Sequence, residues 1–182
     1  MAFFGAYMKI YWTKQNLSSS QLAAAAHRLY CGIPGSLCYN ENGKPYFRES
    51  NVKISISHSG GIWVCVLCEH EAGIDIERVT DRDYIKIAGR FFTEAESRFV
   101  IQNGAEGFFR LWVRKEAYVK YTGLGISYGL GNFSLSDGNA LTDCYDDVTF
   151  KEIDFGESFK CAVCTTKEAF AWKQIKTEEM HI

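Results

Sequence analysis

The 182 residues are enough for one domain, or for two small units packed together, and 47% of them are hydrophobic. The formal net charge is −2, so no bulk field favours nucleic acid, and any anion must be held by local cations and backbone N–H groups. No window approaches the ~20 continuous apolar residues of a membrane span. We therefore expect a folded cytoplasmic protein that binds neither nucleic acid nor membrane.

Periodicity and turn residues predict strands in the first part of the chain, interrupted by one early helix. The helix begins at the serines Ser18 to Ser20, which can cap it, and ends near Tyr30, before a glycine and a proline. The predicted strands, or extended segments, cover residues 3–12, 44–47, 53–57, 62–68 and 73–78.

Helical sequence then dominates, before strand-like runs return at residues 132–172. One helix is expected over 83–91. A second begins at Thr93, because Glu96 three residues later completes a capping-box pattern. A third runs from about Glu106 to Tyr121 and stops at the glycines that follow. Strands and helices in separate runs indicate an α+β fold.

Two C-x-x-C pairs, Cys65 with Cys68 and Cys161 with Cys164, could be read as a four-cysteine zinc site. Both pairs lie in strand-like runs, where positions i and i+3 point to opposite faces of the sheet, so one metal ion cannot easily hold both members of a pair. We therefore interpret the four cysteines as small buried apolar side chains. The runs that contain them also resemble each other, which would suit two similar halves.

The most informative acids lie in Gly73-Ile74-Asp75-Ile76-Glu77. The segment alternates apolar and acidic residues, so it is expected to be a strand that buries the isoleucines in the core and holds both acids outward on the other face. A solvated strand face is the simpler alternative. A helix farther on carries Glu116 and Lys120 one turn apart, with Arg114 and Lys115 beside them. Glu116 and Lys120 alone could be an ordinary helix ion pair.

Together the acidic side chains could bind a hard metal ion, and the basic side chains could bind a phosphate group. Mg²⁺ takes oxygen ligands and keeps positions open for substrate phosphates. The segment Ser57-His58-Ser59-Gly60-Gly61 follows a strand-like run and could offer hydroxyl and backbone donors to an anion, although it could equally be a plain hairpin turn. A dinucleotide fingerprint, a Walker loop and a serine-hydrolase motif are all missing from the sequence.

Four short motifs in a fixed order resemble those of the 4′-phosphopantetheinyl transferase superfamily, specifically the longer surfactin-synthetase-activating type. The motifs are Gly43-Lys44-Pro45, Ile54-Ser55-Ile56-Ser57-His58-Ser59-Gly60, Gly73-Ile74-Asp75-Ile76-Glu77, and Trp112-x-x-Lys115-Glu116-Ala117-x-x-Lys120-x-x-Gly123-x-Gly125. Each motif is weak alone, but their order and spacing are specific. The resemblance covers residues 43–136 well and the later strands loosely.

The resemblance implies an enzyme that moves the phosphopantetheine group of coenzyme A onto a serine of an apo acyl or peptidyl carrier protein, the holo-acyl-carrier-protein synthase type of activity. Its implied metal is Mg²⁺, held by Asp75, Glu77 and Glu116. Glu116, directly or through a metal-bound water, would be the base for the carrier serine, and Lys120 would stabilise or protonate the departing phosphate. The implied coenzyme A contacts are Lys44, Pro45, Ser57, His58, Lys115, Lys120 and Arg28.

The implied fold is a pseudodimer of two similar α+β halves, here residues 1–70, a shortened N-terminal half, and 71–182, which carries the metal site. The active site would lie at the seam, and a monomer would suffice. Only 42 residues precede Gly43, so most of the basic stretch expected to bind the 3′-phosphate of coenzyme A is missing, and Arg28 is the nearest match. Two alternatives remain, a metal-dependent phosphodiesterase acting on coenzyme A-like substrates and a non-catalytic relative that binds carrier proteins.

Overall fold

The computed structural model describes residues 8–125, 128–166 and 175–181. Parts of two predicted strand regions, residues 3–7 and 167–172, lie outside the described residues. The described chain combines two β-sheets with three α-helices, which confirms the predicted α+β class. The helices are α1 (Ser19–Cys31), α2 (Tyr84–Phe91) and α3 (Glu94–Thr122), and a short 3-10 turn, η2, covers Leu130–Asn132.

The strands divide between the two sheets by their place in the sequence, with one exception at the C-terminal end. In spatial order the first sheet contains β10 (Ile175–Glu179), β1 (Met8–Thr13), β5 (Ile62–Cys68), β4 (Lys53–Ser59), β3 (Pro45–Phe47) and β2 (Leu37–Tyr39). The second contains β6 (Ala72–Arg78), β9 (Phe159–Thr166), β8 (Val148–Glu152) and β7 (Cys144–Tyr145).

The exception is β10, which lies parallel to β1 at the edge of the first sheet. The segment predicted as the C-terminal half, 71–182, therefore contributes a strand to the sheet that residues 1–70 otherwise form. Met180, just after β10, is buried with that sheet, and its backbone N–H donates to the Trp12 carbonyl at 2.8 Å.

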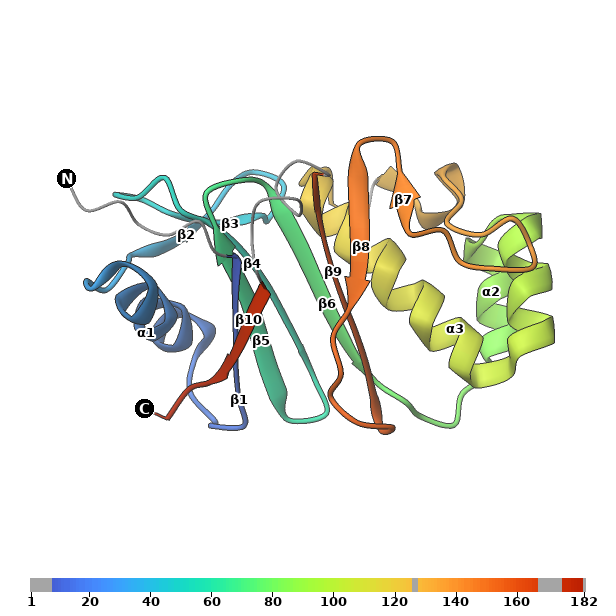
Figure 1. The fold of residues 1–182 in the computed structure, drawn as a ribbon, viewed down its shortest axis with the longest axis horizontal. Helices are drawn as coiled ribbons and strands as arrows, with labels where there is room; N and C mark the ends of the chain where they lie inside the picture. The colour runs from blue at the N-terminus through green and yellow to red at the C-terminus, as the bar shows by residue number, and fades with distance from the viewer. Residues whose placement is uncertain (1–7, 126–127, 167–174, 182) are drawn as a thin grey trace.

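The layers follow the order α1, first sheet, second sheet, and then α3 with α2, as Figure 1 shows. One apolar cluster lies between α1 and the first sheet, one between the two sheets, and one between the second sheet and α2 and α3. Strand β5, whose residues are all buried, is therefore covered on both faces. In β6, Ile74 and Ile76 enter the cluster between the sheets, as predicted, and the alternate positions face α3.

The helix ends match the signals in the sequence. The Ser18 side chain caps α1 in a capping box with Gln21, and Thr93 forms the predicted box with Glu96 at the start of α3. The second and third predicted helices form the single element α3, which is interrupted at Gly104, where φ is 62°. Gly123 ends α3 in the left-handed conformation.

The four cysteines of the C-x-x-C pairs are buried free thiols, which confirms their interpretation as apolar side chains. They lie on β5 and β9, in different sheets. Within the described residues, no helix combines the length and apolar character needed to cross a bilayer.

Candidate active site

A cavity of about 380 Å³ lies between β4, the β2–β3 turn and the C-terminal part of α3. Its lining includes five residues that the sequence predicts for the site, Lys44, Pro45, His58, Glu116 and Lys120. Three of these come from residues 1–70 and two from residues 71–182. The cavity therefore brings together motifs that lie far apart in the sequence.

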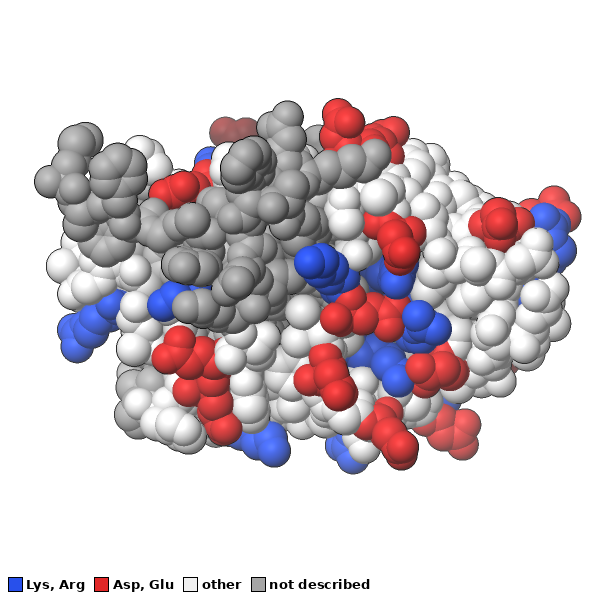
Figure 2. Space-filling view, viewed as in Figure 1, with Lys and Arg blue, Asp and Glu red and all other residues white. Residues whose placement is uncertain are grey.

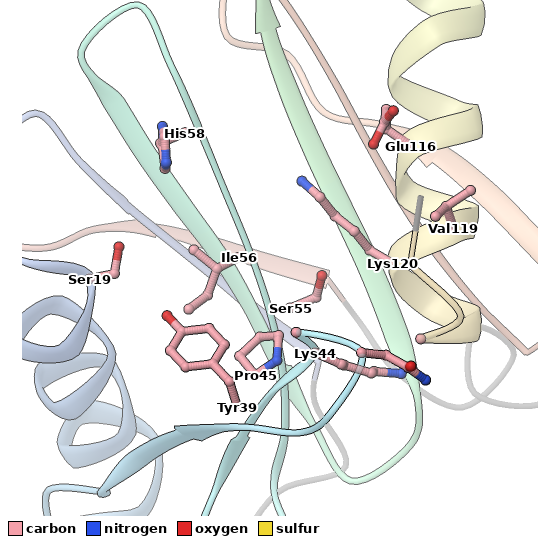
Figure 3. Close-up of a pocket in the computed structure, with 14 residues that line it drawn as sticks. Ser19, Tyr39, Lys44, Pro45, Ser55, Ile56, His58, Glu116, Val119 and Lys120 are labelled. Carbon is pink, nitrogen blue, oxygen red and sulfur yellow. The ribbon is translucent and has the colours of Figure 1, made fainter. Parts of the chain in front are cut away.

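Figure 3 shows how the walls of this cavity are arranged. Glu116 and Lys120 project from α3 on one side, and His58 projects from β4 on the other. Tyr39 and Pro45 lie below His58, on the strands that flank the β2–β3 turn. One wall therefore carries an acid and a cation, while the facing wall offers an imidazole and two rings.

The close approach of β6 to α3 depends on Gly73. A Cβ atom at this position would lie 1.9 Å from the backbone oxygen of Ala117 and 2.7 Å from the backbone nitrogen of Tyr121. Backbone atoms cannot move aside as a flexible side chain can, so only glycine permits this packing. The contact brings Asp75, two residues along β6, beneath the last turns of α3.

Asp75 is the centre of the charged cluster. Its Oδ1 atom accepts hydrogen bonds from Lys120 Nζ at 2.6 Å and from Ser57 Oγ at 2.7 Å. Its Oδ2 atom is buried without a hydrogen-bond partner among the described residues. Burial raises the pKa of the carboxyl group, and Lys120 and Ser57 act in the opposite direction. The expectation that Asp75 is held outward is thus corrected, because α3 covers that face of β6 and the side chain is only 4% exposed.

Glu116 is a half-buried carboxyl group in the cavity wall. Burial raises its pKa, and the negative charges of Asp75 and Glu77 raise it further against the effect of Lys120. Glu77 accepts a hydrogen bond from Ser59 Oγ at 3.0 Å. The three predicted metal ligands are therefore close enough to influence one another electrostatically.

The donor set fits Mg²⁺ in chemistry but is not assembled as a finished metal site. Among residues 8–125, 128–166 and 175–181, no three His, Cys, Asp or Glu side chains are grouped closely enough to hold a metal ion. Asp75, Glu77 and Glu116 nevertheless offer only carboxylate oxygens, which Mg²⁺ prefers. The buried Oδ2 atom of Asp75 lacks the partner that such an atom normally has, which is the observation that favours a cation here.

Lys44 also belongs to the cavity wall, but its ammonium group already has partners. Its Nζ atom lies 2.6 Å from Glu71 Oε2 and donates to the carbonyl of Tyr121 at 2.7 Å. Its stem packs against Gly123, the residue that ends α3. Lys44 thus fastens the β2–β3 turn to the end of α3.

Two other predicted cations face away from the cavity. Lys115 is fully buried, and its Nζ atom lies 2.6 Å from Glu96 Oε1 in the core beneath α3. Arg114 is 6% exposed and pairs with Glu152 of β8. Consecutive residues of a helix point in different directions, so the neighbours of Glu116 cannot all share its face. The expectations that Lys115 binds coenzyme A and that both cations add charge to the site are wrong for this arrangement.

Arg28 does not reach the site either. It lies on the exposed side of α1, beside a separate hollow that Leu29, Pro34 and His181 also line. The buried face of α1, which includes Leu22, packs on the first sheet and turns Arg28 outward. Arg28 is therefore absent from the lining of the 380 Å³ cavity, and its contact with the 3′-phosphate of coenzyme A stays a prediction.

The predicted anion-binding turn has a different form. Strand β4 extends to Ser59, and the turn consists of Gly60 and Gly61, both with positive φ. Ser57 and Ser59 direct their hydroxyl groups at Asp75 and Glu77. His58 is exposed and lines the cavity, whereas the Ser57 side chain is engaged by Asp75. The role of Ser59 was missed, although its place two residues after Ser57 puts both on one face of a strand.

Comparison with known proteins assigns the chain to a family. The model of the 4′-phosphopantetheinyl transferase superfamily matches residues 71–173. The chain is 37% identical over 135 residues to the 4′-phosphopantetheinyl transferase gsp of Aneurinibacillus migulanus, which covers 69% of this chain and 56% of the relative. It is 38% identical over 141 residues to psf-1 of Bacillus pumilus, also a 4′-phosphopantetheinyl transferase, covering 71% and 60%.

A 4′-phosphopantetheinyl transferase of Bacillus subtilis is 32% identical over 162 residues, covering 82% of this chain and 72% of the relative. The chain thus spans little more than half the length of the first two relatives, at 56% and 60%, and more of the third. The family match includes β6 and α3, the elements that carry Asp75, Glu77, Glu116 and Lys120. The chain belongs to the 4′-phosphopantetheinyl transferase superfamily.

Proposed function

We propose that this protein transfers the 4′-phosphopantetheine group of coenzyme A to a serine of an apo acyl or peptidyl carrier protein and releases adenosine 3′,5′-bisphosphate. The observation that carries this proposal is that Glu116 and Lys120 line one wall of the cavity, with Asp75 bound to Lys120 behind it, in a chain of this family. This wall joins a cation suited to phosphate with a carboxylate suited to accepting a proton.

Glu116 is the proposed general base. Its carboxyl group lines the cavity, where a carboxylate can accept the proton of a hydroxyl group brought beside it. It removes the proton of the carrier serine while the serine oxygen forms a bond to the phosphorus next to the pantetheine. The bond between that phosphorus and the bridging oxygen breaks, and adenosine 3′,5′-bisphosphate leaves with the electron pair.

Lys120 is the proposed cation for the departing phosphate. Its ammonium group lies 2.6 Å from Asp75 Oδ1 at the edge of the cavity, so a substrate phosphate would compete with that carboxylate for it. Asp75, Glu77 and Glu116 are the residues proposed to hold Mg²⁺. When bound, the ion would neutralise charge on the pyrophosphate and help to orient it.

Coenzyme A is the proposed donor, and the remaining cavity residues are proposed to contact it. Tyr39 and Pro45 offer apolar surface for the nucleotide base, and His58 offers a hydrogen bond or a charge to a phosphate. Lys44 contacts a phosphate only if it leaves Glu71 or shares its ammonium group. We also propose that the two sheets represent two related halves, because the similar cysteine-bearing runs form inner strands, β5 and β9, of separate sheets.

The test is intact-protein mass spectrometry of an apo acyl carrier protein and an apo peptidyl carrier protein, each incubated with this protein, coenzyme A and Mg²⁺. We expect each suitable carrier to gain the mass of one phosphopantetheine. Addition of EDTA should abolish the gain, and the preferred carrier should be modified faster.

Two other outcomes would support different functions for the same cavity. Degraded coenzyme A with unmodified carriers would favour a metal-dependent phosphodiesterase that uses water as its nucleophile. Unmodified carriers with intact coenzyme A would favour a non-catalytic relative that binds carrier proteins. A control without this protein separates each outcome from spontaneous loss of coenzyme A.

A further inference from the structure

The two sheets meet along β4 and β6, which are not paired by a strand ladder. Strand β6 is the edge strand of the second sheet, so its alternate backbone N–H groups point away from β9. Each of these N–H groups needs a hydrogen-bond partner outside the second sheet. Ser55 Oγ accepts from the Ile74 N–H at 3.1 Å, and Ser59 Oγ accepts from the Arg78 N–H at 3.0 Å. Side-chain hydroxyl groups therefore replace a backbone ladder at this junction.

We call Ser55, Ser57 and Ser59 the serine row. They occupy alternate positions of β4 and so share one face of the strand. The opposite face of β4 carries Ile54, which is buried against α1. Because this face of β4 packs in the apolar cluster between α1 and the first sheet, the serine row on the other face points toward the junction of the two sheets.

Two members of the serine row also hold the acids of β6. Ser57 donates to Asp75 Oδ1 at 2.7 Å, and Ser59 donates to Glu77 Oε2 at 3.0 Å. The bond from Ser57 engages only Oδ1 of Asp75 and leaves the buried Oδ2 atom without a partner among the described residues. Ser55 bonds the backbone of β6 and holds neither acid.

We propose that Ser57 and Ser59 are positioning residues that fix the orientation of Asp75 and Glu77 for a divalent cation. The inference rests on the metal site of the proposed function. It assigns Ser57 a role different from the phosphate contact that its motif implies, because its hydroxyl is already committed to a carboxylate. Partners that orient metal ligands commonly change metal affinity by about 10- to 100-fold when they are removed.

The test measures Mn²⁺ binding to the free protein, without coenzyme A or carrier protein. Mn²⁺ shares the preference of Mg²⁺ for carboxylate oxygens, and its unbound fraction is counted by electron paramagnetic resonance. We expect Ser57→Ala and Ser59→Ala each to weaken Mn²⁺ binding by about 10-fold or more. Ser59→Thr keeps a hydroxyl at a half-buried position and should restore the affinity.

Ser55→Ala is the matched control, because it removes a hydroxyl from the same face of the same strand without touching an acid. Like the other two variants, it should lower thermal stability, yet it should leave Mn²⁺ affinity at the wild-type value. This contrast separates positioning of the acids from a general loosening of the junction. Ser59→Ala, at the end of β4, provides the second variant if Ser57→Ala fails to fold.

Wild-type Mn²⁺ affinity in both Ser57→Ala and Ser59→Ala would overturn the inference while leaving the metal site intact. Equal weakening by all three alanine variants would also overturn it, since Ser55 would then matter as much as the serines on the acids. A wild-type protein that binds no Mn²⁺ would overturn the metal site and this inference together. Transfer activity is measured separately, so a failure of the proposed function is recognised by unmodified carriers.

Discussion

Lys115 and Glu96 form an ion pair inside the core, with 2.6 Å between Lys115 Nζ and Glu96 Oε1 and both side chains fully buried. The pair links the two parts of α3 across the interruption at Gly104. Lys115 Nζ also donates to the carbonyl of Phe133, and Glu96 Oε1 accepts from the N–H of Leu135. The segment after α3 is therefore fastened to the helix that carries Glu116 and Lys120.

Removal of one partner should destabilise the fold, because the other charge would remain buried without compensation. Lys115→Met keeps a long apolar side chain but removes the ammonium group. We expect a loss of about 3–5 kcal/mol in the free energy of unfolding, measured by urea denaturation. Burial lowers the pKa of Lys115 and Glu96 opposes this effect, so the ammonium group depends on its partner.

The matched control for Lys115→Met is Arg98→Met on the surface of the same helix. Arg98 pairs with Glu94 at 2.8 Å, but the two side chains are 53% and 90% exposed. An exposed helix pair contributes only about 0.3–0.5 kcal/mol, so this change should be nearly neutral. Similar losses in the two variants would contradict the importance assigned to burial.

Glu116→Gln and Glu77→Gln test the acids of the proposed active site. Glutamine has the same shape but can neither accept the serine proton nor supply a negative charge to the cation. We expect Glu116→Gln to slow phosphopantetheine transfer by about 10²- to 10⁴-fold, the usual contribution of a general base. Glu77→Gln should raise the Mg²⁺ concentration that half-maximal transfer requires.

Both acid variants are compared with Glu157→Gln, which changes an exposed glutamate in the turn before β9. This control should transfer at the wild-type rate. Full activity in both Glu116→Gln and Glu77→Gln would show that the metal-site hypothesis is wrong.

Local signals in the sequence predicted much of this structure. Capping at Thr93, the stop at Gly123 and the alternation of Ile74 and Ile76 depend on neighbouring residues, and the structure has each of them as expected. The structure also brings Glu116, Lys120 and other residues of the motifs to one cavity, while their roles there stay predictions.

The incorrect predictions concern the directions of side chains and the pairing of strands, which only the tertiary structure determines. The motif places Lys115 beside Glu116 in the sequence, which predicts a place in the site, yet its position on the helix turns it into the core. Asp75 was expected to face outward because an alternating strand has one polar face, but α3 covers that face. The parallel docking of β10 on β1 joins distant segments, and no local pattern predicts such a pairing.

Glu152 should give the protein a measurable dependence on acid pH. Burial pushes the pKa of this carboxyl group upward, but hydrogen bonds and charge from Arg110 and Arg114 outweigh burial, so the pKa lies below its usual range. Because the pKa of Glu152 is lower in the folded state, its ionised carboxylate stabilises the fold at pH values above its unfolded-state pKa of about 4.3. This stabilisation is lost as the pH falls through the pKa of the folded state. Figure 2 shows acidic and basic side chains side by side on the face over β8, β9 and α3.

Glu152→Gln should therefore reduce the loss of stability between neutral and acid pH, although it lowers stability at neutral pH by removing the closest acidic partner of Arg114. The free energy of unfolding is measured by urea denaturation across this pH range. Glu157→Gln, which removes a carboxylate from an exposed position, should follow the wild-type curve. If the free energy of unfolding of Glu152→Gln depended on pH as that of the wild type does, Glu152 would not be a source of the loss of stability in acid.

Gly73 gives the strongest test of how the fold builds the site. In Gly73→Ala the new methyl group would meet the Ala117 carbonyl at 1.9 Å, so β6 and α3 must separate. Overpacking of this kind costs about 1–3 kcal/mol or more. The separation should also weaken the ion pair of Lys120 with Asp75, so transfer should fall even where the variant remains folded.

Gly89→Ala is the matched control, because Gly89 lies inside α2 and a Cβ atom there meets nothing within 4 Å. Replacing a helical glycine that has free space should increase stability by about 0.5–1 kcal/mol and leave transfer unchanged. The two variants add the same methyl group, so opposite changes in the unfolding midpoint would isolate the effect of the β6–α3 contact. A stable and fully active Gly73→Ala would mean that β6 and α3 need not approach this closely for Lys120 to work with Asp75.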